Sequence, residues 1–198
     1  CSGLYLEAVS STQEATPGSI VKLNLEAINR STTSMQLISV TSLPEQKTTA
    51  LNTDLKNNSL QNSTIDLQLP QSINYTQPYW LKENGTVGLY TVADQKNIGI
   101  PDIIRETKVI FNVKISGVEI PFERTVVYKY NDDVKGEIYN FLDIVPIVTT
   151  AIQDKVLLFP NTKPKYVGIT IIAGKNDLKG SLKLDLPKDW KISPASIP

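Results

Sequence analysis

KVIFNVKISGVEIPF, residues 108–122, carries the clearest structural signal of the chain. Apolar side chains occupy every second position over residues 109–115, which is the period of a strand with one face in a core. Ser116 and Gly117 then interrupt the pattern, and a glycine supplies the positive φ that a short hairpin loop requires. Because a second alternating run follows as far as Tyr130, the stretch predicts a β-hairpin.

The same period of two recurs along the chain, and turn residues separate the alternating segments. One such segment, residues 21–27, follows the turn signal Thr16-Pro17-Gly18. Further strands are expected at residues 35–43, 65–69 and 86–92. The polar segment 45–63 is expected to be a loop or a pair of weak edge strands. A single helical turn is expected at residues 102–105, and the fold class is therefore all-β.

The second half of the chain repeats this pattern on a smaller scale. Strands are expected at residues 155–159, 166–173 and 181–186. Turn residues and a proline at 131–147 indicate a hinge. We therefore predict two β-sandwich (immunoglobulin-like) modules in tandem, at residues 1–140 and 141–198. The second is expected to be truncated, because an immunoglobulin-like sandwich needs about seven strands.

Composition excludes several classes of function. The 198 residues include 20 basic and 20 acidic side chains, so no net charge attracts nucleic acid. No histidine is present, which removes the usual general base and the commonest metal ligand. No apolar stretch reaches transmembrane length, since Asp143 and Gln153 interrupt the best candidate. We expect no enzyme activity, no cofactor and no zinc.

Two features of the sequence bear on where the protein is located. The only cysteine, Cys1, precedes Ser2 as in a lipidated bacterial lipoprotein, and the other interpretation is a cloning or proteolytic boundary. Asn-x-Ser/Thr sequons are expected to mark exposed polar stretches, with glycosylation and chance occurrence as alternatives. They begin at Asn29, Asn57, Asn62, Asn74 and Asn84.

Several short blocks of sequence resemble one protein family. They are SGLYLEA (2–8) with TPG (16–18), QPYWL (77–81), GLYTV (88–92), and YKY (128–130) leading to DVKGE (133–137). Together they are similar to the region that follows the catalytic domain in large PIG-L/LmbE-type deacetylases of Bacteroidetes. Residues 147–198, with a Leu-Pro-x-x-Trp pattern, resemble the immunoglobulin-like module called the galactosidase-associated C-terminal domain.

The resemblance implies a setting for the chain rather than an activity of it. In that family a zinc-dependent domain with histidine and aspartate ligands removes acetyl groups from N-acetylglucosamine-type substrates. None of its motif is present here, so no catalytic residue can be assigned. What the resemblance implies is an extracytoplasmic bacterial protein related to carbohydrate, whose partners are adjacent domains of the same polypeptide.

Aromatic residues form the first candidate site. Flat rings stack on the apolar face of a sugar, so Tyr75, Tyr79, Trp80 and Tyr90 are a candidate carbohydrate-binding surface. The alternative is that they lock a strand edge into the core. Trp190, after a strand end and a turn, is interpreted as a core residue.

Carboxylates form the second candidate site. Asp132, Asp133 and Glu137 lie close together in the sequence, and calcium takes hard oxygen ligands from such loops. The alternative is an ordinary turn, because Asn-Asp-Asp is a common turn sequence. The leading functional hypothesis is a non-catalytic accessory or spacer region, and the alternative is a carbohydrate-binding module.

Overall fold

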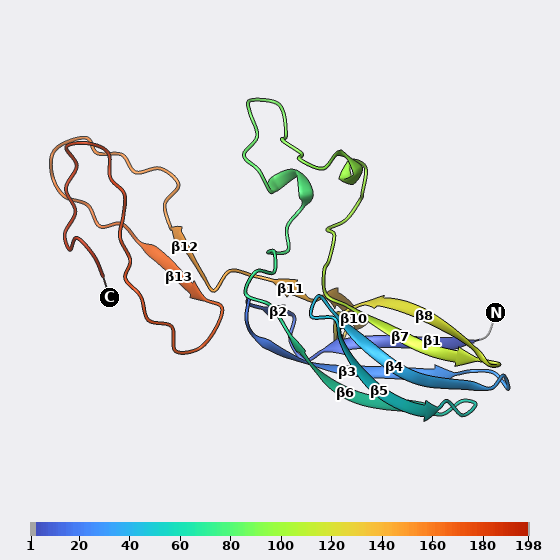
Figure 1. The fold of residues 1–198 in the computed structure, drawn as a ribbon. Helices are drawn as coiled ribbons and strands as arrows, with labels where there is room; N and C mark the ends of the chain where they lie inside the picture. Colours follow the sequence, from blue (N-terminus) through green and yellow to red (C-terminus); the bar gives the residue numbers. More distant parts are fainter. Residues whose placement is uncertain (1–2, 198) are drawn as a thin grey trace. The chain divides into compact units, whose positions relative to one another are not determined.

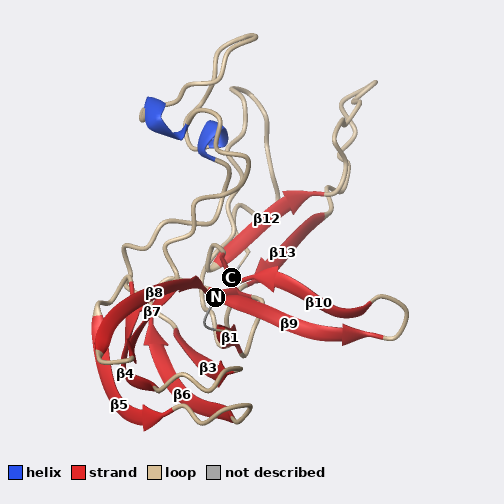
Figure 2. Cartoon of the chain, turned by 90° about the vertical axis from the view of Figure 1, so that its right-hand side faces the viewer, coloured by secondary structure: helices blue, strands red, loops and turns tan. Residues whose placement is uncertain are grey.

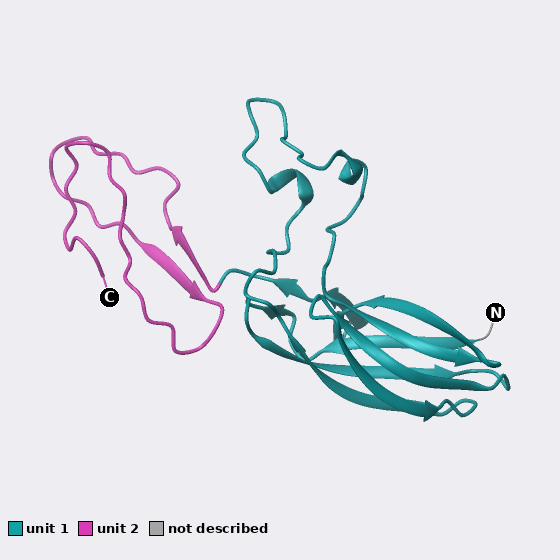
Figure 3. Ribbon diagram, viewed as in Figure 1, with its two compact units in different colours: residues 1–146 teal, residues 147–198 magenta. Residues whose placement is uncertain are grey.

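The computed structural model describes residues 3–197 and confirms the all-β class. Contacts divide the chain into two compact units, residues 1–146 and residues 147–198 (Figure 3). Each unit is described by itself.

Unit 1 is a sandwich of two mainly antiparallel sheets (Figure 1). The five-stranded sheet has the order β10-β9-β1-β3-β6, and the four-stranded sheet has the order β5-β4-β7-β8. The strands of the first sheet are β1 (Leu4–Ser10), β3 (Ile20–Asn29), β6 (Leu60–Gln68), β9 (Val127–Asp132) and β10 (Gly136–Phe141). Those of the second are β4 (Met35–Leu43), β5 (Lys47–Asp54), β7 (Lys108–Ile115) and β8 (Val118–Thr125). All neighbours are antiparallel except β1 and β9, which pair in parallel at one position.

Alternation of side chains builds the core of this sandwich. On β7, Val109, Phe111 and Val113 are fully buried, and on β3 Leu23 and Leu25 are buried in the same way. The inward faces of the two sheets thus form one apolar cluster. Burial of each such side chain contributes roughly 1.5–3 kcal/mol, which makes this core the main source of stability in unit 1.

The hairpin predicted at residues 108–122 is confirmed. β7 pairs with β8 in register, with Ile115 opposite Val118. Ser116 and Gly117 form the loop, and both have positive φ. That conformation matches the two-residue turn whose twist fits the flanking strands.

Other strand predictions have mixed outcomes. The strand at residues 35–43 is confirmed as β4, and the polar segment 45–63 contains β5 and the start of β6, both at sheet edges. Residues 86–92 hold only an isolated bridge between Thr86 and Leu89. The helical turn expected at residues 102–105 does not form, and the short 3₁₀ helices are η1 (Tyr79–Leu81) and η2 (Gln95–Asn97).

The segment predicted as a hinge, residues 131–147, is instead mostly part of unit 1. After β8 the chain passes through the buried Val126 and joins the other sheet as the β9–β10 hairpin (Figure 2). The short strand β11 (Asp143–Ile144) then pairs in parallel with β2 (Glu14–Ala15). The two units divide after Pro146 rather than at residue 140, because Leu142 and Ile144 are buried in the first core.

Unit 2 contains one hairpin, formed by β12 (Val148–Ile152) and β13 (Ile169–Ala173). The strand expected at residues 155–159 is absent, and the one at 181–186 is reduced to a bridge between Leu182 and Ile197. None of the described residues of this unit is buried. Trp190 is half exposed and stands edge-on to the ring of Phe159, so its interpretation as a core residue is wrong.

Candidate functional site

A long excursion between β6 and β7 holds all four aromatic residues of the candidate carbohydrate site. We use the name excursion for residues 74–106, which leave the sandwich after the buried Ile73 and return at the buried Thr107 (Figure 1). None of its residues is buried. Because it contains no strand, its shape depends on 3₁₀ turns and on side-chain contacts rather than on a sheet ladder.

The four aromatic residues do not form one flat platform. Tyr79 and Trp80 pack against each other on η1, with ring centroids 4.9 Å apart and planes at 88°. The hydroxyl of Tyr79 accepts a hydrogen bond from the backbone N–H of Gly99, which ties η1 to the far arm of the excursion. Tyr75 and Tyr90 are exposed, whereas Tyr79 and Trp80 are only partly so. The site therefore offers separate rings rather than a planar pair.

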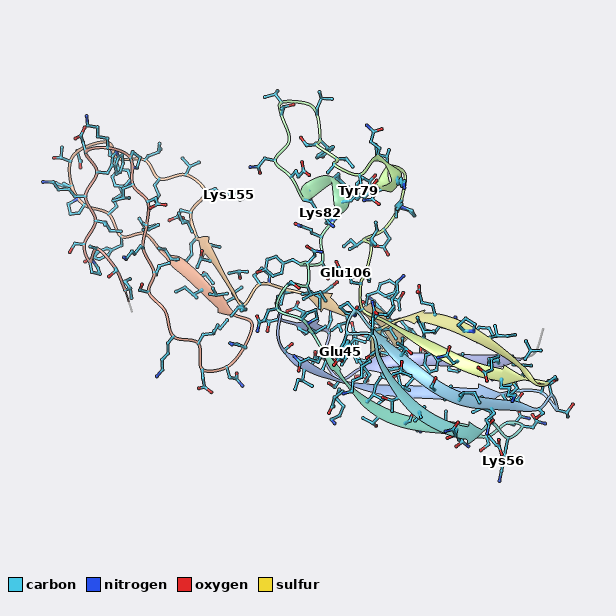
Figure 4. All side chains as sticks on the ribbon, viewed as in Figure 1. Glu45, Lys56, Tyr79, Lys82, Glu106 and Lys155 are labelled. Atoms are coloured by element: carbon cyan, nitrogen blue, oxygen red, sulfur yellow. The ribbon has the colours of Figure 1, made fainter. Side chains whose placement is uncertain are left out.

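The base of the excursion is fastened to β11. The N–H of Thr76 donates to the carbonyl of Ile144, and the N–H of Ile144 donates to Oγ1 of Thr76. Asn74 also donates to Glu106 at 2.7 Å, so the outgoing and returning arms are joined to each other. Figure 4 shows Glu106 where the excursion rejoins the sandwich and Tyr79 farther out along it.

Arg105 makes the strongest contact at this base. Its Nη1 donates to Oδ1 of Asp143 at 2.6 Å, and its guanidinium lies over the Phe141 ring, 4.5 Å from the centroid. Only 11% of the Arg105 side chain is exposed. Its Nε is buried and has no hydrogen-bond partner among the described residues. Asp143 is 37% exposed, so the pair is shielded on the arginine side only, and it helps the backbone bonds of Thr76 to hold the excursion at this point.

A small hollow lies beside Arg105. It is lined by residues of both arms and of β11, including Asn74, Thr76, Lys82, Arg105, Glu106 and Ile144. Its cavity volume of about 20 Å³ is room for about one water molecule. The lining carries cations and a carboxylate together, so no single charge dominates it.

A second cluster of charged side chains lies on the outer face of the five-stranded sheet. Lys129 on β9 contacts Glu7 on β1 at 2.8 Å, and Glu26 and Glu137 at 3.7 Å each. Burial lowers the pKa of Lys129, but the hydrogen bond to Glu7 and the three carboxylate charges outweigh burial and hold that pKa above its ordinary value. The pKa of Tyr5 is also raised. Here burial acts in the same direction as the hydrogen bond with Glu7, because the charged form of tyrosine is the deprotonated one. The cluster links four strands, β1, β3, β9 and β10, of which the first two are distant from the last two in the sequence.

The candidate calcium residues lie in and beside the β9–β10 turn. Oδ1 of Asp132 accepts hydrogen bonds from the N–H groups of Val134 and Lys135, and these bonds lower the pKa of Asp132. Glu137 accepts a hydrogen bond from the Tyr139 hydroxyl, while Asp133 is exposed. Over residues 3–197, no three His, Cys, Asp or Glu side chains come together as a metal site requires. The geometry is that of a capped turn.

Two other groups of residues named from the sequence can be placed. The Asn29 sequon is not an exposed loop, because Asn29 is buried and its Nδ2 donates to the carbonyls of Thr33 and Leu55. The other four sequon asparagines are exposed. Cys1 and Ser2 lie outside the described residues, so the structure does not bear on lipid attachment.

Sequence reasoning did not find the Arg105–Asp143 and Lys129–Glu7 pairs. The two residues of each pair are 38 and 122 residues apart, and no feature of the neighbouring sequence indicates that they are in contact.

Comparison with known family models, with curated proteins and with solved structures finds no match to this chain.

Proposed function

We propose that this chain is a non-catalytic accessory region of a larger extracytoplasmic bacterial protein, of the kind that PIG-L/LmbE deacetylases contain. One observation carries the proposal. The shielded Lys129 and Arg105 each pair with a carboxylate from a distant segment: Lys129 pairs with Glu7, and Arg105 pairs with Asp143, which is itself 37% exposed. Groups used in this way hold strands together, which is the role expected of a spacer or docking module. The resemblance of residues 2–146 supports the setting.

The sequence supports the same proposal from a different direction. Deacetylation in this family requires zinc held by histidine and aspartate, and the chain contains no histidine. Among the described residues, no helix is long and apolar enough to cross a membrane. The partners that the resemblance implies are the neighbouring domains of the same polypeptide.

An activity and metal assay tests the proposal. The purified chain is incubated with zinc and N-acetylglucosamine substrates, and acetate release and bound zinc are measured. We expect no turnover above the blank and no stoichiometric zinc. Turnover that grows in proportion to the protein concentration, or one zinc per chain, would overturn the proposal.

Carbohydrate binding by the excursion is the second candidate function. The exposed rings of Tyr75 and Tyr90 favour it, because an exposed phenol ring can stack on a pyranose. N-acetylglucosamine oligosaccharides are titrated into a Trp190→Phe variant, in which Trp80 is the only tryptophan, while fluorescence and amide chemical shifts are recorded. Tyr90→Ala should abolish saturable shifts, whereas Tyr139→Ala on the sandwich, which also removes an exposed tyrosine, should not. An unsaturated titration at millimolar sugar would exclude this function.

A further inference from the structure

The tip of the excursion is a turn that its own hydrogen bonds hold together. Thr86 and Leu89 exchange two backbone hydrogen bonds, of 2.9 and 3.2 Å. The hydroxyl of Thr91 donates to the backbone carbonyl of Asn84 at 3.1 Å, which joins the two sides of the turn. All four residues are exposed, and the turn lies away from the sandwich (Figure 1). The backbone of the tip is therefore held in place and also accessible to water.

Gly85 lies where the two sides of this turn come close together. A Cβ atom at Gly85 would lie 2.6 Å from the carbonyl oxygen of Leu89, closer than Cβ atoms approach other atoms in proteins. The turn therefore requires glycine at this position, where only a residue without a side chain fits. The lack of a side chain also leaves the backbone nitrogen of Gly85 unshielded. No hydrogen bond from the Gly85 N–H is present among residues 3–197.

An asparagine that precedes a glycine can react with its own backbone. When the Gly85 nitrogen loses its proton, it can attack Cγ of Asn84, because the two atoms close an unstrained ring through the Asn84 main chain. A bulky side chain on the second residue hinders this attack, and glycine has none. Asn84 is the only asparagine of the chain that precedes a glycine. The packing of the tip thus imposes the dipeptide in which this reaction is easiest.

The Thr91 hydroxyl lies where it can assist the attack. As the Gly85 nitrogen loses its proton, negative charge spreads onto the carbonyl oxygen of the same peptide group, which is the backbone oxygen of Asn84. This is the oxygen to which Thr91 donates. A hydrogen-bond donor placed where charge develops stabilises the reacting state. The bond is exposed, so we expect it to accelerate the reaction by about two- to tenfold, as an ordinary hydrogen bond would.

We propose that Asn84 is a site of spontaneous deamidation, in which the Gly85 nitrogen is the nucleophile and the Thr91 hydroxyl stabilises its deprotonated form. A bond forms between that nitrogen and Cγ of Asn84, and the bond from Cγ to Nδ2 breaks. Nδ2 leaves as ammonia and takes up the proton that the nitrogen gave. Water then opens the resulting succinimide at either carbonyl, which yields aspartate or isoaspartate. The reaction needs no partner other than water and is independent of the proposed function.

The product differs from the starting chain at the point that organises the tip. Either product carries a carboxylate, so the chain gains one negative charge. In isoaspartate the main chain runs through the former side chain of Asn84, and the carbonyl that accepted the Thr91 hydrogen bond becomes part of a free carboxylate. Deamidation also removes the acceptor of the Asn84 sequon, so it and glycosylation exclude each other at this position.

Mass spectrometry of the full chain tests the proposal. The chain is produced in a host that adds no glycans and is incubated in isotopically labelled water at mildly alkaline pH. Trypsin releases residues 83–96 by cleavage after Lys82 and Lys96. We expect Asn84 to convert with time to both aspartate and isoaspartate, each carrying labelled oxygen from the water. Asn176, which is also exposed but precedes aspartate, should remain largely unconverted over the same period.

Three variants separate the roles of the two residues. Thr91→Val keeps the shape of the side chain but removes the donor, and it should slow conversion of Asn84 by about two- to tenfold. Thr91→Ser keeps a hydroxyl and should retain most of the rate. Asn84→Gln should stop the reaction, because the longer side chain would have to close a larger ring. The wild type and Thr91→Val are also compared in concentrated urea, where the hydrogen bond is absent and the two rates should be equal.

Two results would overturn the proposal. The first is conversion of Asn84 in the folded chain that is no faster than conversion of Asn176. The second is a ratio of wild-type to Thr91→Val rates that is the same, or lower, in the folded chain than in urea. In that case the hydroxyl does not stabilise the attacking nitrogen.

Discussion

Unit 1 and unit 2 have similar alternating sequences and different degrees of burial. Strands β3 and β7 of unit 1 each bury three or more side chains, while β12 and β13 bury none. The apolar residues are comparable: Val109 and Val113 on β7, Ile169 and Ile171 on β13. What differs is the opposing sheet, which covers the inward face in unit 1 and has no equivalent in the described part of unit 2.

The comparison shows that alternation specifies a strand but not a core. A half-apolar strand becomes stable when a second layer removes its apolar face from water. The excursion of unit 1 likewise contains apolar residues that are not part of a core. Its exposed apolar side chains, such as Val87 and Leu89, have no covering layer, and two fastenings at its base hold it in place.

The largest expected effect comes from truncating a buried side chain in the core of unit 1. Phe111→Ala removes a fully buried ring and should lower the free energy of unfolding of unit 1 by about 3–5 kcal/mol. Phe159→Ala, the matched change in unit 2, should cost less than about 1 kcal/mol, because that ring is only partly covered. Urea unfolding followed by circular dichroism measures both. Equal losses would break the distinction between the units.

A smaller effect is expected at the base of the excursion. Arg105→Ala removes a charged hydrogen bond whose arginine is shielded and whose carboxylate is 37% exposed, and it should cost about 1–2 kcal/mol. Lys22→Ala breaks the exposed Lys22–Asp66 pair and should cost no more than about 1 kcal/mol. Limited proteolysis should also cut residues 74–106 faster in Arg105→Ala, and Arg105→Lys should restore part of the resistance. Unchanged cleavage would show that the base is fastened by backbone bonds alone.

The Lys129 cluster predicts an alkaline loss of stability in unit 1. Because the folded pKa of Lys129 is raised, its contribution is fully present below the ordinary lysine pKa of about 10.4 and is lost as the pH rises above that value. Lys129→Met should cost about 1–2 kcal/mol at pH 7. The difference from the wild type should shrink above about pH 10.4.

Tyr5 must be separated from Lys129 in that experiment. Its pKa is also raised, so deprotonation above about pH 10 destabilises the fold in the same direction. The measurement is therefore repeated on a Tyr5→Phe background. A Lys129→Met difference that grows with pH would contradict the assignment.

The smallest effect is expected at the tip of the excursion. Val87 is fully exposed, so Val87→Ser should change the free energy of unfolding by no more than about 0.5 kcal/mol. Val113→Ser, the same change in the core, should cost several times as much because it also buries a hydroxyl. Thermal unfolding compares the two variants. A marked loss in Val87→Ser would mean that the tip is covered in solution.

In unit 1, the sequence predicts the elements that are formed by residues close to each other in the chain. Alternation and turn chemistry give β4 and the β7–β8 hairpin, because both depend on residues near each other in the sequence. The crossing at Val126, where the chain leaves one sheet for the other, has no local signal. A run of alternating residues looks the same whether it continues a hairpin or begins a strand elsewhere.

The candidate sites show the same limit. The sequence groups Tyr75, Tyr79, Trp80 and Tyr90 correctly into one segment, but ring orientation depends on η1 and on the bond to Gly99. Pairing of Lys129 with Glu7 depends on β9 lying beside β1, which is a property of the whole sheet. The sequence therefore identifies which side chains could take part in a site, but it does not predict which of them are in contact.

Amide hydrogen exchange of the monomeric full chain tests the central claim most directly. The claim is that unit 1 has a core covered by two sheets and that the described residues of unit 2 have no buried core. Exchange at Leu23, Phe111 and Val113 should be at least about a thousandfold slower than at Thr170 and Ile172, relative to unstructured rates. Protection of Thr170 and Ile172 within about tenfold of the unit 1 core would contradict the account.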